Sequence, residues 1–199
     1  MTAEPLFFDP AEPIAGFTFQ QPFATAIIGM PPTESTPPCD GPKRNENRSW
    51  APPRSRPFPF WIAVHAGATF YPGPTRETFT KRTGYMDCKP PLWPDCPTFA
   101  TMPRRAIVGL ARVMHAVPYD EATGRERFLH SPAQRAALDL VASDPWAFGP
   151  WCWTLDRTVV QLATPIPWPK GALGLWAVPP ETLALLRAAR EDRALWRTV

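Results

Sequence analysis

Long apolar runs are missing from this 199-residue sequence, and no window approaches the roughly 18 consecutive apolar residues of a membrane-spanning helix. We therefore expect no membrane span and no membrane partner. The N-terminus also lacks a basic stretch followed by an apolar core, so no signal peptide is expected. These absences predict a cytoplasmic protein.

Cysteine and histidine are scarce, with four and three residues. The cysteines are widely scattered, and the spacing between Cys88 and Cys96 matches no standard zinc motif. Without an export signal, the pattern indicates reduced thiols and no disulfide framework. We expect no metal and no cofactor.

Strong net charge is absent as well. The formal charge is +3 and charged residues make up 20% of the chain, which by itself is too weak to require a nucleic-acid partner. The apolar fraction of 44% is that of an ordinary globular protein. The length fits a single domain over residues 1–199, and no internal repeat is visible.

Proline and tryptophan, in contrast, are abundant, with 29 and nine residues. Proline disfavours helix interiors and central strands, so much of the chain is expected in loops or at strand edges. Tryptophan suits either a packed core or a platform on which bases stack, and composition does not choose between them.

Apolar alternation and short apolar runs predict a series of strands, at 17–19, 45–50, 60–66, 106–117, 151–155, 158–163 and 172–178. Helices are predicted at 21–30, at 131–143 with Ser131 as N-cap, and at 180–197. This order favours a mainly β fold with flanking helices (α+β), a small mixed barrel and not a parallel βαβ sheet. The barrel would span about 16–178, with proline-rich loop insertions at about 31–40 and 68–103.

The segment 41–50, GPKRNENRSW, gathers cations around a single acid. If 45–50 is a strand, Glu46 and Arg48 point to the same face, and Lys43 enters from a turn. Such a rim can bind a ligand, with Glu46 accepting from a base N–H and Arg48 holding a phosphate or carbonyl. It can also catalyse, with Lys43 activated and Glu46 shuttling a proton. A surface ion pair of little consequence is the third interpretation.

The pattern Gly41-x-Lys43-x-x-Glu46-x-Arg48 resembles the signature of the ASCH (activating signal cointegrator homology) family. Further segments resemble the family in the same order, from Gln20 to about Val178: 21–24 (QPFA), 46–50 (ENRSW), 61–67, 106–109, 146–153 and 170–176. Phe23 stands where the family usually has tryptophan, and the segment 68–103 is much longer than in the family pattern.

This resemblance implies a PUA-like β-barrel with a cleft between barrel and helix. PUA-like domains are RNA-binding modules, and relatives in the superfamily read modified bases. Some compact ASCH proteins hydrolyse an acetyl group from modified cytidine with the signature lysine, and ribonuclease activity has been proposed in the family. The amidohydrolase members carry threonine at the position of Glu46, a departure that argues against a simple transfer of their activity.

Two functions from different classes are therefore expected. The first is a module that binds RNA, single-stranded nucleic acid or a modified nucleotide, through Gln21, Lys43, Arg44, Glu46, Arg48, Trp50 and His65. His65 enters this set as a cleft-edge residue implied by the resemblance, and Trp50 as a ring on which a base stacks. The alternative is a hydrolase acting on an acylated nucleoside or on RNA, with Lys43 as base or nucleophile and Glu46 as acid and base.

Further residues bear on these two expected functions, and a third function is open as well. Trp146, Phe148, Trp151 and Trp153 form an aromatic group that suits either barrel packing or stacking. Arg104 and Arg105 can extend a phosphate-contacting surface. A third possibility is an interaction scaffold that offers its proline-rich loops to a protein partner.

Overall fold

The computed structural model describes residues 12–30, 43–70, 101–119, 131–144, 146–147 and 149–198. Its strands are β1 (Ile14–Gln21), β2 (Asn45–Arg48), β3 (Phe60–Phe70), β4 (Ala106–Pro118), β5 (Trp151–Pro167), β6 (Leu175–Trp176) and β7 (Trp196–Thr198). Its helices are α1 (Phe23–Ile28), α3 (Pro132–Ala142), α4 (Pro180–Glu191) and the short 3₁₀ helix η2 (Arg193–Leu195).

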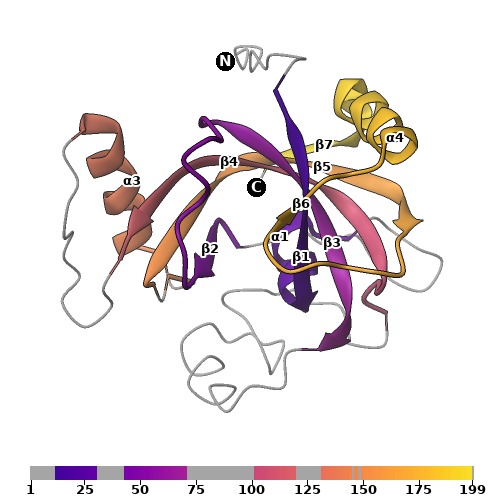
Figure 1. The fold of residues 1–199 in the computed structure, drawn as a ribbon, viewed down its shortest axis with the longest axis horizontal. Helices are drawn as coiled ribbons and strands as arrows, with labels where there is room; N and C mark the ends of the chain where they lie inside the picture. The colour runs from indigo at the N-terminus through magenta and orange to yellow at the C-terminus, as the bar shows by residue number, and fades with distance from the viewer. Residues whose placement is uncertain are drawn as a thin grey trace.

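All seven strands belong to one sheet, in the order β2-β5-β4-β3-β1-β6, with β7 added to β5. Among the described strands, β1 and β3 pair in parallel and the other pairs are antiparallel. The long strands β3, β4 and β5 curl strongly (Figure 1). The predicted mainly β fold with flanking helices is confirmed, and the curled sheet is consistent with the predicted small barrel.

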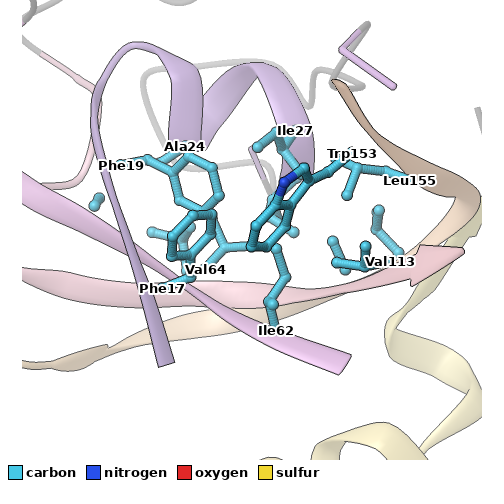
Figure 2. Close-up of a cluster of buried hydrophobic side chains, with 14 of the residues drawn as sticks. Phe17, Phe19, Ala24, Ile27, Ile62, Val64, Val113, Trp153 and Leu155 are labelled. Carbon is cyan, nitrogen blue, oxygen red and sulfur yellow. The ribbon is translucent and has the colours of Figure 1, made fainter. Parts of the chain in front are cut away.

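The main core lies between the sheet and α1 (Figure 2). Strand alternation sends Phe17 and Phe19 of β1, and Ile62 and Val64 of β3, into this core. Trp153 of β5 lies with its ring parallel to that of Phe17, at a centroid distance of 5.3 Å. The opposite face of the same strands forms a second core with α4, in which Trp61, Leu110 and Leu186 are buried.

Gly109 lies where the Ile28 side chain of α1 packs on the sheet. A β-carbon built at Gly109 would lie 2.4 Å from the carbonyl oxygen of Val160 and 2.7 Å from Cγ2 of Ile28. The register of β4 shifts between Ile107 and Gly109. The bulge or close approach predicted at this glycine is therefore confirmed, and both features occur together.

The predicted start of the second helix is also confirmed. Ser131 is the N-cap of α3, its side chain accepts from the backbone N–H of Gln134, and the two residues form a capping box. Pro132 occupies the first turn, where its missing N–H costs nothing.

Several predicted bounds were wrong. The strands expected at 151–155 and 158–163 are one continuous strand of 17 residues, β5. The first helix is shorter than 21–30, and the last strand of the barrel is reduced to the two residues of β6. The C-terminal helix ends at Glu191, because Trp196 does not extend it and instead begins β7, which pairs with β5 across Val160.

Only the ends of the expected loop insertions belong to the described residues. Residues 68–70 belong to β3, so the loop starts later than position 68. Residues 31–42, which contain Gly41, and 71–100 lie outside the described residues. Within the described part of the chain, no helix is long and apolar enough to cross a membrane.

Candidate functional site

Two backbone hydrogen bonds fix the start of the predicted site between α1 and the sheet. The N–H of Lys43 donates to the carbonyl of Ala26 in α1 (2.8 Å). The carbonyl of the next residue, Arg44, accepts from Leu155 of β5 (2.9 Å). Since successive residues of a strand direct their carbonyls to opposite edges, the carbonyl of Asn45 points away from β5. Lys43 therefore sits at the outer edge of β2, which is the edge that faces away from β5.

Lys43, Glu46 and Arg48 form one ion cluster. The Lys43 ammonium donates to the carbonyl of Asn45 and to Oε2 of Glu46. The other carboxylate oxygen, Oε1, lies 2.8 Å from Nη2 of Arg48. Lys43 is 1% exposed and Glu46 7%, while the Arg48 side chain keeps 25% of its surface. Glu46 and Arg48 share a face as predicted, and the cluster is buried, which sets it apart from an ordinary surface ion pair.

Aromatic rings surround this cluster. The guanidinium carbon of Arg48 lies 4.2 Å from the ring centre of Phe17 and 5.4 Å from that of Phe19. The Lys43 nitrogen lies 5.8 Å from the ring centre of Phe23. Cations over ring faces are attracted by the ring quadrupole, most strongly where water is scarce. The rings thus help to hold the two cations in place.

Trp50 and Trp153 complete the aromatic wall. Trp50 is half-buried and meets Trp153 edge-on, at a centroid distance of 5.0 Å. Trp153 lies directly across from Glu46 in the β2–β5 pair and is fully buried. Its indole N–H finds no hydrogen-bond partner among the described residues. Figure 2 places this nitrogen on the α1 side of the ring, near Ile27. A buried donor without a hydrogen-bond partner is uncommon in folded proteins.

Two predicted site residues have structural partners. The buried Gln21 donates to the carbonyl of Pro103 (2.6 Å) and accepts from the backbone N–H and hydroxyl of Thr25. It thereby supplies the side-chain acceptor for the first turn of α1 that the N-cap Pro22 lacks. Arg44 donates to the carbonyls of Lys43 (2.8 Å) and Ile27 (3.4 Å) and is half-buried.

His65 is not brought together with the ion cluster. It lies in β3 beside Thr18 of β1, and both belong to the face opposite to Phe17 and Phe19. Its ring nitrogens contact the hydroxyl of Thr18 (3.2 Å) and the carbonyl of Trp168 (2.9 Å). Burial lowers the pKa of His65, and the hydrogen bond to Trp168 opposes this shift. The expectation of one cleft shared by Lys43, Arg48 and His65 is therefore not met.

Asp144 was missed by sequence reasoning. It follows α3, accepts from the backbone N–H of Trp146 (2.8 Å), and interacts electrostatically with Lys43 and Arg44. Burial raises the pKa of the Asp144 carboxyl, although the Trp146 hydrogen bond and the two cations counteract this. A buried carboxyl whose pKa is raised and that interacts with two cations is typical of functional sites. In the sequence, the only indication of Asp144 was its position at the end of a predicted helix.

The remaining candidates are spread over the molecule. Trp146 is buried, and Trp151 packs against the main core; Phe148 lies outside the described residues. In the described ranges no three His, Cys, Asp or Glu side chains gather as metal ligands would. A separate hollow of about 530 Å³ is lined, in the described part of the chain, by Ala68, Met102, Arg104 and Arg105.

The site is thus a buried lysine–glutamate–arginine cluster at the outer edge of β2, walled by aromatic rings from β1, α1 and β5. Its cations can hold phosphate or carbonyl oxygens, and its carboxylate can accept from an amine or amide. Comparison of the chain with protein-family models and with curated proteins finds no match.

Proposed function

We propose that this protein binds a nucleotide or nucleic acid, RNA or a modified nucleotide in particular, at the ion cluster of Lys43, Glu46 and Arg48. The observation that carries the proposal is the burial of this cluster among aromatic rings. Burying three charges is costly and adds little to stability, so retention of the cluster favours a function.

The chemistry of the site suits a nucleotide. The partly exposed Arg48 offers hydrogen bonds to phosphate or carbonyl oxygens, and a carboxylate accepts from base N–H groups. Trp50, half-buried at the rim, offers a ring face worth about 1–3 kcal/mol to a stacked base. The resemblance to the ASCH family and its PUA-like, RNA-binding superfamily supports the same conclusion.

Titration of labelled single-stranded RNA, single-stranded DNA and free nucleotides at several salt concentrations tests the proposal. Phosphate contacts predict that affinity for the polymers falls as salt rises. Arg48→Ala should weaken binding about tenfold, equivalent to about 1.4 kcal/mol. The exposed Arg157 in β5 provides a matched control, since Arg157→Ala removes the same charge from an exposed position outside the cluster. Absence of binding by all three ligand types at low salt would contradict the proposal.

A hydrolase is the second candidate, favoured by the direct contact of a buried lysine with a carboxylate. Lys43 would act as base or nucleophile towards an acylated nucleoside or RNA, and Glu46 would transfer the proton. Wild type and Lys43→Met, whose fold is checked by circular dichroism, are incubated with acylated nucleosides and with RNA. Loss of turnover in the variant is expected. Equal turnover by both proteins would remove Lys43 from the mechanism.

A further inference from the structure

The loop between β2 and β3, residues 51–59, is rich in cations and contains no acid. Its sequence is APPRSRPFP. Arg54 is exposed in a turn that is closed by a hydrogen bond from the N–H of Arg56 to the carbonyl of Pro53 (3.0 Å). Neither arginine makes an ion pair with a carboxylate in the described part of the chain. The loop therefore presents positive charge that no neighbouring acid balances.

An exposed aromatic ring accompanies these cations. Phe58 is 40% exposed, and it is the only aromatic side chain among the large apolar residues that are exposed in the described ranges. Its ring centre lies 5.6 Å from that of the buried Phe60 and 6.3 Å from that of His115 in β4. The guanidinium carbon of Arg56 lies 5.3 Å from the Phe60 ring centre. Neighbours from two strands thus hold the Phe58 ring while much of it stays open to solvent.

A series of ring contacts joins this loop to the ion cluster. Phe60 belongs to the main core and meets Trp153 at a centroid distance of 6.3 Å. Trp153 in turn meets Trp50 at 5.0 Å and lies across from Glu46 in the β2–β5 pair. Phe58 and Trp50 are therefore two partly exposed rings at the ends of a buried pair. A strand of a few nucleotides is long enough to reach both.

We propose that Arg54, Arg56 and Phe58 form a loop surface that binds the nucleotides next to the one held at the ion cluster, so that the ligand is a single strand of RNA and not a free nucleotide. This inference rests on the proposed function and names the form of its ligand. Phe58 stacks on an unpaired base, and the arginines contact phosphates. Bases inside a duplex have no free face to offer, so the loop surface selects single strands.

The surroundings of Phe58 favour RNA over an apolar protein partner. A docking surface for an apolar partner gathers several exposed apolar side chains. The other large apolar residues that are exposed in the described ranges belong to α3, α4 and the segment before β6: Leu140, Leu185 and Leu173. Phe58 is instead accompanied by arginines, and a ring beside cations is the usual composition of a surface for single-stranded nucleic acid.

Calorimetric binding of UMP, AMP and the single-stranded RNA hexamers of uridylate and adenylate to the full chain tests the proposal. Wild type should bind the preferred hexamer at least about tenfold more tightly than its monomer. Phe58→Ala should lose at least about fivefold in hexamer affinity, while monomer affinity stays within about twofold. Leu185→Ala removes an exposed apolar side chain from α4 and is the matched control, which should leave both affinities unchanged.

Two further variants separate stacking from an effect on folding. Phe58→Tyr keeps the aromatic ring, whereas Phe58→Leu keeps an apolar side chain without a ring. Phe58→Tyr should retain hexamer affinity within about twofold of wild type, and Phe58→Leu should lose at least about fivefold. Circular dichroism checks the fold of both. Equal hexamer affinity of these two variants would overturn stacking at Phe58.

The salt dependence of hexamer binding tests the phosphate contact of Arg54. Each phosphate that a cation neutralises on a single strand adds about 0.7 to the slope of log affinity against log salt concentration. Arg54→Ala should therefore reduce this slope by about 0.7. Arg157→Ala, which removes an arginine from an exposed position of β5, should leave the slope unchanged. The same slope in wild type and Arg54→Ala would contradict the phosphate contact.

The two proposals fail in different ways. Hexamer binding that falls in Arg48→Ala but in neither Phe58→Ala nor Arg54→Ala overturns the loop surface and leaves the proposed function standing. Equal affinity of monomer and hexamer has the same meaning. Absence of binding by monomers and hexamers at low salt overturns both proposals.

Discussion

At the scale of single residues, Glu46 is the side chain on which the charge balance of the ion cluster depends most. It is the carboxylate that separates the buried ammonium of Lys43 from the guanidinium of Arg48 and pairs with both. The aromatic rings around the cluster supply an attractive quadrupole but no negative charge. Without Glu46, two cations would face each other in a region poor in water.

Glu46→Gln is therefore expected to lower the free energy of unfolding by about 3–5 kcal/mol, the usual cost of leaving a buried charge without its partner. Urea unfolding at neutral pH measures this change. Glu191→Gln removes an exposed carboxylate from the last turn of α4 and should change stability by less than about 0.5 kcal/mol. A similar small effect of both substitutions would show that the cluster is solvated.

His65 belongs to a chain of hydrogen bonds with a defined direction. The carbonyl of Trp168 can only accept, so Nε2 of His65 carries the proton and Nδ1 accepts from the hydroxyl of Thr18. That hydroxyl oxygen accepts in turn from the indole N–H of Trp176 (3.2 Å). With His65 neutral, every link of this chain is made, and the chain ties the segment between β5 and β6 to β1.

Burial lowers the pKa of His65 below its ordinary 6.5, which sets the sign of a pH effect. The unfolded chain binds a proton near pH 6.5 and the folded protein only at lower pH, so acidification favours unfolding. Stability should be independent of His65 above about pH 7 and should fall from about pH 6.5 downwards. Thermal unfolding of wild type and His65→Gln between pH 5 and 8 measures this dependence. The variant should show a shallower decline, and parallel curves would contradict the assignment.

At the scale of elements, the packing of α1 on the sheet depends on the bulge in β4. Gly109 lets the helix approach, because any side chain there would meet a backbone carbonyl of β5 and the Ile28 side chain of α1. The backbone oxygen cannot rotate away as a side chain would. Since α1 also holds Lys43 through the carbonyl of Ala26, its distance from the sheet sets the geometry of the ion cluster.

Gly109→Ala should consequently destabilise the protein by about 1–3 kcal/mol, the range for an overfilled core, and should weaken ligand binding as well. Gly67→Ala is the comparison, since the nearest contact of its added β-carbon would be 3.1 Å, against 2.4 Å at Gly109. Urea midpoints of the two variants give the test. A larger loss for Gly67→Ala would contradict the packing argument.

At the scale of the whole molecule, the central strand β4 is expected to be more stable against local opening than β6 at one end of the sheet. Strand β4 has 13 residues and pairs with β3 from Ala106 to Val113 and with β5 from Ala106 to Pro118. Strand β6 contributes only Leu175 and Trp176 and pairs only with β1. Local opening therefore costs far less at β6 than at β4.

Native-state hydrogen exchange should reflect this difference. The amides of Leu110 and Ala111 in β4 are expected to exchange only through global unfolding. Those of Leu175 and Trp176 should exchange at least about tenfold faster, through local opening. Exchange followed by NMR at neutral pH measures both sets. Equal protection would show that β6 unfolds only together with the central strands.

The sequence by itself determined the features that depend on local chemistry. Ser131 and Pro132 identified the start of α3, because capping involves only neighbouring residues. The common face of Glu46 and Arg48 followed from the period of two in a strand. Gly109 marked a special backbone position, and the runs of apolar residues identified β3 and β4.

Only the tertiary structure decided which segments meet. The polar pair Asp156-Arg157 looked like a break between two strands, yet pairing with β4 on one side and β7 on the other carries β5 through it. Trp196 fitted the end of a helix, but its contact with Trp61 and pairing across Val160 place it in β7. For the same reason His65, which was expected at the site, lies on the face opposite to Phe17 and Phe19, and Asp144, which the sequence did not single out, interacts electrostatically with Lys43 and Arg44. Which side chains lie near Lys43 depends on the order and curl of the strands in the sheet. No local sequence pattern encodes that order.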